Sequence, residues 1–149
     1  MEQIEQTVVS LLTEYKTRNP FELCNELGIT VVFPEMATHI KGFYTNLNGI
    51  EIIYLNCNLP EWEQRVVCAH ELGHALLHQH MNSMFITYHT NLNSGRYENE
   101  ADYFCACLLL EDEWFQPNSE FSTLKQISAY SGVELRLVEM RAKALMAEN

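Results

Sequence analysis

The chain has 149 residues, of which 47% are hydrophobic and 19% charged, as in a single globular domain with a hydrophobic core. Its formal net charge of −11 disfavours non-specific binding to nucleic acid or anionic lipid. No apolar run approaches the ~18 residues of a membrane span and the first residues do not resemble a secretory signal, so we expect a cytoplasmic protein, without a membrane partner, whose five cysteines are reduced.

The first sixty residues predict two helices and a small sheet. The first helix is indicated by apolar residues that recur with the spacing of one helix face: Ile4, Val8, Leu11, Leu12 and Tyr15. A short helix follows, with Asn19 as its N-cap, Pro20 in its first position and Gly28 at its end. Strands are predicted at 29–33, 39–45 and 50–55, with a tight hairpin turn at Asn48-Gly49. We expect a small antiparallel sheet, in which the strand containing Gly42-Phe43-Tyr44 could bind an extended peptide.

Helices dominate the rest of the chain. A helix capped by Asn58 is predicted to run to about His80, and residues 81–96 lack periodicity, as in a long loop beside a site. An apolar helix is predicted from 97 to 110. Thr123 and Gln126 form a capping-box pattern that begins a helix to about residue 130, followed by a turn at Gly132 and a last helix to about residue 146.

These elements predict an α+β fold. The sheet packs on helices, the helix at 58–80 is central, and the C-terminus forms a helical hairpin. We expect a single domain over 1–149, with a catalytic core at 1–117 and the hairpin at 118–149.

The central helix contains the pattern His-Glu-x-x-His, as His70-Glu71-Leu72-Gly73-His74. Residues four apart on a helix lie about 40° apart around it and about 6 Å apart along it, so both histidines can reach one ion. Zinc hydrolases need this geometry, with neutral imidazoles as ligands, an open position for water and a carboxylate to accept the proton. The pattern therefore predicts His70 and His74 as metal ligands and Glu71 as the catalytic base.

Catalytic zinc usually has a third protein ligand, and two more histidines lie nearby. His78 lies about 12 Å along the helix from His70, which is too far for one ion. His80 has the metzincin spacing, but Leu77 stands where that motif needs a glycine. Both histidines are therefore poor candidates.

The acids ahead of the apolar segment 103–110 are better candidates. Glu98 and Asp102 lie four residues apart and share one helix face. This arrangement suits Glu98 as the third ligand and Asp102 as an outer carboxylate that accepts the N–H of a metal-bound histidine. Glu100 faces away from that side and is the alternative ligand.

Three motifs, in this order, resemble the ImmA/IrrE family of metallopeptidases. They are residues 17–29, the His70-to-His74 pattern, and Glu98-x-Glu100-Ala101-Asp102-x-Phe104. The family's catalytic core resembles thermolysin-type gluzincins, in which the third ligand is a Glu followed four residues later by an outer Asp. The resemblance maps these roles onto Glu98 and Asp102. The family commonly has Asn at the position of Asp102, and often Met-Pro where this chain has Leu110-Glu111.

The resemblance implies a zinc-dependent intracellular endopeptidase that cleaves a cognate helix-turn-helix repressor of a phage, a mobile element or a stress regulon. Glu71 would activate the water that attacks the peptide carbonyl. Tyr97 and His89, in or beside the loop, are candidate donors to the oxyanion. Mn²⁺ or another divalent metal can replace zinc in such a site.

Two other functions are compatible with the sequence. Residues 127–138 have the spacing of a helix-turn-helix, but 118–149 hold four acids against four bases, so direct DNA binding is disfavoured. The second alternative is a metal-binding regulatory protein that acts on a repressor or on DNA by binding rather than proteolysis. The intact Glu71 argues against it, because holding a metal does not require that residue.

Overall fold

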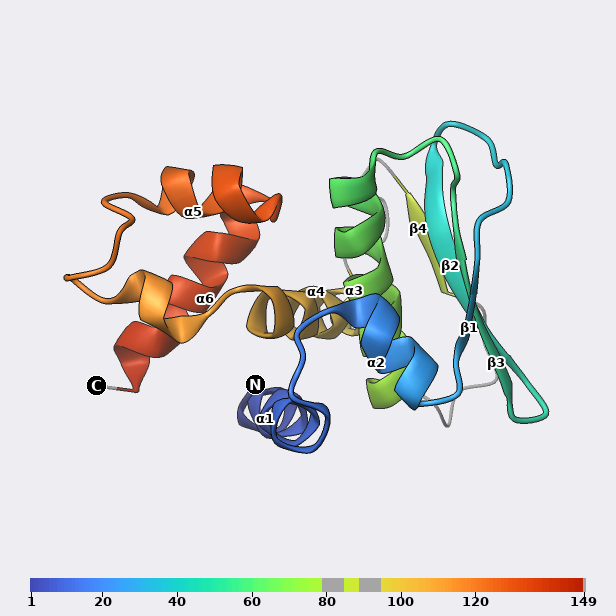
Figure 1. Cartoon of the computed structure of the whole chain (residues 1–149), viewed down its shortest axis with the longest axis horizontal. Helices are drawn as coiled ribbons and strands as arrows, with labels where there is room; N and C mark the ends of the chain where they lie inside the picture. Colours follow the sequence, from blue (N-terminus) through green and yellow to red (C-terminus); the bar gives the residue numbers. More distant parts are fainter. Residues whose placement is uncertain (79–84, 89–94, 149) are drawn as a thin grey trace.

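The computed structural model describes residues 1–78, 85–88 and 95–148. A four-stranded sheet lies at one end of the molecule, and helix α3 (Glu61–Leu77) packs beside it (Figure 1). Helix α4 (Arg96–Leu109) contacts α3 and leads toward α5 (Leu124–Ser131) and α6 (Leu135–Ala147) at the opposite end. The α+β class and the central position of the helix that carries His70 and His74 are confirmed.

The sheet is mixed, whereas the sequence predicted an antiparallel one. Its order is β1-β3-β2-β4, in which β1 (Thr30–Val32) pairs in parallel with β3 (Ile50–Leu55). β2 (Ile40–Leu47) pairs antiparallel with β3 across a hairpin turn, where Asn48 and Gly49 have φ of 54° and 83°. After β1, the chain skips one position in the sheet before it forms β2, and it then turns back so that β3 lies between β1 and β2. β3 runs antiparallel to β2 and therefore parallel to β1.

A fourth strand, β4 (Phe85–Tyr88), lies inside the predicted loop 81–96. Aromatic and β-branched residues favour a strand here, but the surrounding Asn, Ser and Gly residues hid the signal. β4 pairs antiparallel with β2, with an irregularity between Ile40 and Gly42. β2 is therefore paired on both sides, and the prediction that Gly42–Tyr44 could bind a peptide by strand addition is wrong. Among the described strands, β4 and β1 form the edges.

The central helix differs from its prediction at both ends. Pro60, not Asn58, occupies the N-cap position, and no side chain caps the helix. The helix ends at Leu77 with His78 as C-cap, because His78 leaves helical geometry. Close packing against α4 depends on Gly73, where a Cβ would lie 3.1 Å from the Phe104 ring and 3.2 Å from the Ala101 Cα. This contact brings the acids of α4 against the histidines of α3.

Local signals placed α1, α2 and α5 correctly, whereas the short 3₁₀ helix near residue 113 was not predicted. α1 spans Glu2–Tyr15 and α2 spans Pro20–Glu26, where the Asn19 side chain accepts from the Phe21 N–H at 2.9 Å. A short 3₁₀ helix, η1, spans Asp112–Phe115. The capping box of Thr123 and Gln126 begins α5, and Gly132 ends it with φ of 78°.

One hydrophobic cluster connects these elements. It extends from Ile4 of α1, through the buried faces of α3 and α4, to Leu137 and Val138 of α6. The division at residue 117 stays a prediction. Within the described part of the chain, no helix has the length and apolar character to cross a membrane.

Candidate metal centre

His70, His74 and Glu98 meet at the contact between α3 and α4. One ligand atom from each lies within 4.8 Å of the others. The Glu98 carboxylate lies 3.0 Å from His70 Nε2 through one oxygen and 2.8 Å from His74 Nε2 through the other. Both histidines are buried, because this face of α3 is covered by α4. The three candidate ligands therefore converge on one point.

The other ring nitrogen of His70 is held by Asp102. Asp102 Oδ1 lies 2.9 Å from His70 Nδ1 and accepts its N–H. A proton fixed on Nδ1 leaves the Nε2 lone pair available for a metal, so this contact selects the ligating tautomer. Asp102 thus lies where the sequence placed an outer carboxylate.

His74 is supported by a residue that sequence reasoning set aside, His78. The two Nδ1 atoms lie 2.9 Å apart, so a proton on His74 Nδ1 can be donated to His78 and leaves His74 Nε2 available. His78 is buried, and its Nε2 lies 3.7 Å from Glu100. His78 was set aside as a third ligand because of its distance from His70, but its one-turn separation from His74 could have predicted this support.

The alternative ligand, Glu100, lies outside the converging set. Its carboxylate lies 3.3 Å from Arg96 Nε and 3.7 Å from His78 Nε2. The separation follows from helix geometry, because Glu100 is two residues from Glu98 and faces a different side of α4. The structure brings Glu98, not Glu100, to both histidines.

Charge in this cluster is unbalanced without a cation. Glu71 is fully buried next to His70, and Glu98 and Asp102 bring two more carboxylates to the same place. Burial lowers the pKa of His70, but hydrogen bonds with Asp102 and Glu98 outweigh it and raise the pKa to about 10. Burial raises the pKa of Glu98, but hydrogen bonds with His70 and His74 lower it to about 2. The cluster attracts positive charge, which suits a divalent metal.

The chemistry of the donor set fits zinc. Two imidazole nitrogens and one carboxylate are the protein ligands of a His₂Glu catalytic site, which leaves a fourth position for water. Mn²⁺ and other divalent ions accept the same donors. His70, His74 and Glu98 could therefore hold a divalent metal, with Glu71 beside it on α3.

Of the two candidate oxyanion donors, only Tyr97 belongs to the described residues. Tyr97, at the start of α4, is 38% exposed, and its ring packs edge-on against His78 at 4.7 Å. Tyr97 therefore contacts His78, the residue that holds His74 Nδ1. His89 lies outside the described residues.

Sequence reasoning missed Arg136 of α6. Its Nη2 donates to Asp102 Oδ2 at 3.1 Å, and its Nε donates to Glu134 Oε2 at 2.9 Å. Asp102 thus connects His70 on one side to Arg136 on the other. No local signal marks Arg136, because 34 residues separate it from Asp102.

The family model of the IrrE N-terminal-like domain, a peptidase family designated M78, matches residues 24–143. The chain belongs to the ImmA/IrrE family. The resemblance found in its motifs is therefore confirmed, and this peptidase family has the hydrolase chemistry that His-Glu-x-x-His predicts.

Two relatives of this ImmA/IrrE protein are similar over most of their length. "Uncharacterized immunity region protein 2" of Bacillus phage phi105 is 38% identical over 141 residues, which cover 93% of this chain and 88% of the relative. "Metallopeptidase ImmA" of Bacillus subtilis (strain 168) is 27% identical over 135 residues, covering 87% of this chain and 78% of the relative.

Proposed function

We propose that this ImmA/IrrE protein is a zinc-dependent endopeptidase whose metal is held by His70, His74 and Glu98. The convergence of these three side chains, with Glu71 buried beside them, is the observation that carries the proposal. The printed name of the ImmA relative, a metallopeptidase, supports it.

The metal ligands, the residues that hold them and Glu71 have different roles in the proposed reaction. When bound, zinc supplies Lewis acidity that lowers the pKa of a water and polarises a carbonyl oxygen. Asp102 and His78 hold the Nδ1 atoms of the two histidines, which fixes their rings and leaves Nε2 available. Glu71 accepts a proton from the attacking water and donates it to the leaving amine as the peptide bond breaks.

We further propose that the substrate is a helix-turn-helix repressor and that cleavage occurs in the cytoplasm. The phage relative's name places that relative in an immunity region. The net charge of −11 suits a substrate with the basic surface of a DNA-binding protein. Tyr97 and His89 stay candidate donors to the oxyanion.

Co-incubation with a candidate helix-turn-helix repressor tests the proposal. The zinc-loaded protein and its Glu71→Gln variant are each mixed with the repressor, and intact mass identifies any fragments. We expect defined fragments with the wild type and a rate about 10²–10⁴-fold lower with Glu71→Gln, because the general base is lost while the ligands stay. Equal cleavage by both proteins would reject Glu71 as the base.

Glu61→Gln is the matched control, because Glu61 lies exposed at the start of the same helix. It should cleave at the wild-type rate. Full zinc content with no cleavage of the repressor by the wild type would instead favour a regulator that acts by binding.

A further inference from the structure

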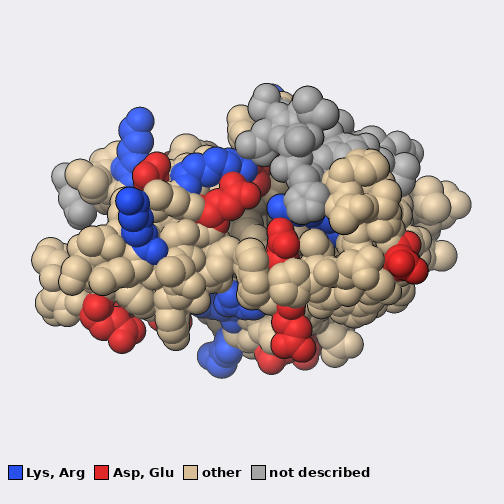
Figure 2. Space-filling model, turned by 90° about the horizontal axis from the view of Figure 1, so that it is seen from above, with Lys and Arg blue, Asp and Glu red and all other residues tan. Residues whose placement is uncertain are grey.

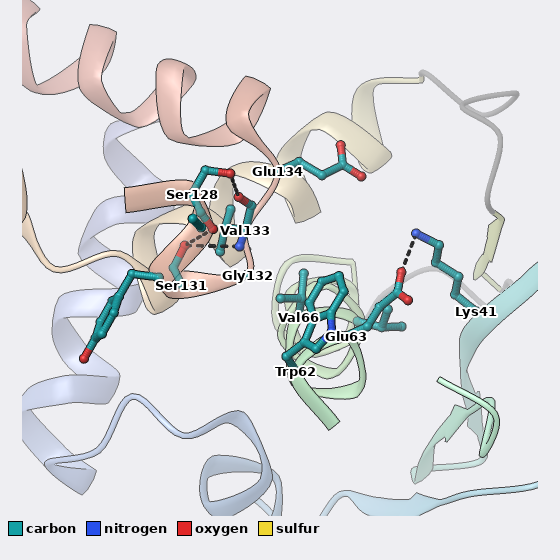
Figure 3. Close-up of a pocket in the computed structure, with 12 residues that line it drawn as sticks. Lys41, Trp62, Glu63, Val66, Ser128, Ser131, Gly132, Val133 and Glu134 are labelled. Carbon is teal, nitrogen blue, oxygen red and sulfur yellow. Dashed lines mark hydrogen bonds and ion pairs between the residues drawn. The ribbon is translucent and has the colours of Figure 1, made fainter. Parts of the chain in front are cut away.

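A pocket of about 580 Å³ lies between the first turns of α3 and the turn that joins α5 to α6. Figure 3 shows Trp62 and Val66 of α3 between Gly132–Val133 on one side and Lys41 of β2 on the other. Its volume falls within the range of small-molecule sites. Nothing in the proposed chemistry uses this pocket.

The walls of the pocket are apolar and its charges are paired. Val66, Val67 and Val133 line it together with Trp62, which is 55% exposed. At the rim, Lys41 Nζ lies 2.9 Å from Glu63. Paired charges at the rim and exposed apolar surface within favour an uncharged apolar group as occupant.

Side-chain contacts link Glu134, on the opposite rim, to the candidate metal centre. Glu134 lines the pocket and accepts from Arg136, which also binds Asp102, the partner of His70. Figure 2 shows this side of the molecule, where acidic and basic side chains gather along a hollow between its two halves. The pocket and the candidate metal centre are therefore joined through three consecutive contacts.

The pocket also lies on the same face of α3 as the metal ligands. Trp62, Val66 and His70 are spaced four residues apart, so they occupy successive turns of one face. Val66 and Trp62 lie about 6 and 12 Å before His70 along the helix axis. An extended peptide advances about 3.3 Å per residue, so this distance equals about two to four residues.

We propose that this pocket is a specificity subsite that takes a large aliphatic or aromatic side chain of the polypeptide substrate, about two to four residues from the scissile bond. The inference rests on the proposed peptidase function. The position of Val66 one turn before His70 on α3, together with the contacts that link Glu134 to Asp102, favours the substrate chain over a second copy of this protein. A second copy would also bring its own charge of −11 to the same surface.

Binding to a catalytically inactive protein tests the subsite without turnover. Zinc-loaded Glu71→Gln carrying Trp114→Phe leaves Trp62 as its single tryptophan, whose emission reports on the pocket. The probes are capped ten-residue peptides of Ala, Ser and Lys in which one residue, moved along the peptide, is Phe or Ala. We expect the best Phe peptide to shift Trp62 emission and to bind about tenfold or more tightly than its Ala counterpart.

Filling the pocket should remove this preference. Ala129 of α5 is exposed and lines the pocket, so Ala129→Phe occupies it without disturbing the core. The matched control is Ala147→Phe, at an exposed position on α6 that does not line the pocket. We expect Ala129→Phe to abolish the tenfold preference and Ala147→Phe to keep it.

Three outcomes would overturn the subsite. They are equal affinity for Phe and Ala peptides, a preference that survives Ala129→Phe, and no binding of any peptide. Zinc-dependent cleavage by the wild type is measured separately. A working peptidase without the binding preference would reject the subsite alone, and binding without cleavage would reject the peptidase function alone.

Discussion

Two buried polar clusters meet α4 at consecutive residues, Asp102 and Tyr103, and they differ in what neutralises them. Asp102 belongs to the candidate metal centre, where carboxylates surround histidines. Tyr103 belongs to a second cluster in which the Arg141 guanidinium donates to Tyr103 Oη at 2.8 Å, Glu5 at 3.1 Å and Asp112 at 2.9 Å. The second cluster contains its own permanent cation.

The difference indicates what each cluster is for. Arg141 stays charged at every physiological pH, so its cluster holds a permanent positive charge and ties α1, α4, η1 and α6 together. In the candidate metal centre, Arg136 pairs with the outer oxygen of Asp102, and only histidines face the buried carboxylates of Glu71 and Glu98, so the centre has room for a further cation. Removing residues from each cluster should therefore affect different properties.

Loss of the metal should be the largest effect. Glu98→Ala removes one of the three candidate ligands, so we expect zinc to be lost on dialysis. Glu100→Ala should retain zinc, because Glu100 contacts Arg96 and His78 instead. Metal content by mass spectrometry measures both. Zinc retained by Glu98→Ala and lost from Glu100→Ala would exchange their roles.

Removing Arg141 should instead affect stability. Its side chain is 7% exposed, so Arg141→Met leaves Glu5 and Tyr103 without their cation and should lower the free energy of unfolding by about 3–5 kcal/mol. Urea denaturation gives this value. Zinc affinity should change less than twofold, and Lys143→Met, exposed on the same helix, should change neither property. A loss of zinc affinity with Arg141→Met would show that the two clusters are coupled.

Removing Arg136 should have a smaller effect, and it should lower zinc affinity rather than stability. Its side chain is 43% exposed, so Arg136→Ala should barely alter folding, but it releases Asp102 and should weaken zinc binding about tenfold. Competition with a zinc chelator measures the affinity, with Lys143→Ala as the control. In an Asp102→Asn background, Arg136→Ala should have no further effect; a full tenfold loss there would mean that Arg136 acts by another route.

The smallest effect is a difference in pH dependence of the metal-free protein. The pKa of folded His70 is raised to about 10, so its contribution to stability is present below its ordinary pKa of about 6.5 and is lost as pH rises from there through 10. The pKa of Glu98 is lowered to about 2, so its contribution is present above about 4.5 and is lost as pH falls toward 2. Arg141 produces no alkaline loss in this range.

Denaturation in EDTA across this pH range should therefore show a progressive loss of stability between pH 6.5 and 10. Added zinc should remove that loss, because a metal binds neutral imidazole. A stability that stays constant from pH 6.5 to 10 in EDTA would mean that His70 does not hold its proton between the two carboxylates.

Patterns of short range were sufficient for much of the molecule. The spacing of His70 and His74, the hairpin turn at Asn48-Gly49 and the capping box at Thr123 each depend on residues within about one turn of one another. The sequence also indicated that Glu98 and Asp102 lie near the same histidines, because a separation of four residues places both on one face of the helix. Local geometry fixes such relations before any long-range contact forms.

Only the tertiary structure decided which distant groups meet. The parallel pairing of β1 with β3 depends on how a connection crosses the sheet, and the contact of Arg136 with Asp102 depends on how α6 packs against α4. The pocket at Trp62 likewise exists because Gly132 ends α5 against α3. The sequence by itself determined the candidate ligands and the helices that carry them. Long-range packing decided what supports those ligands and what lies beside them, because contacts between distant residues leave no periodic pattern along the chain.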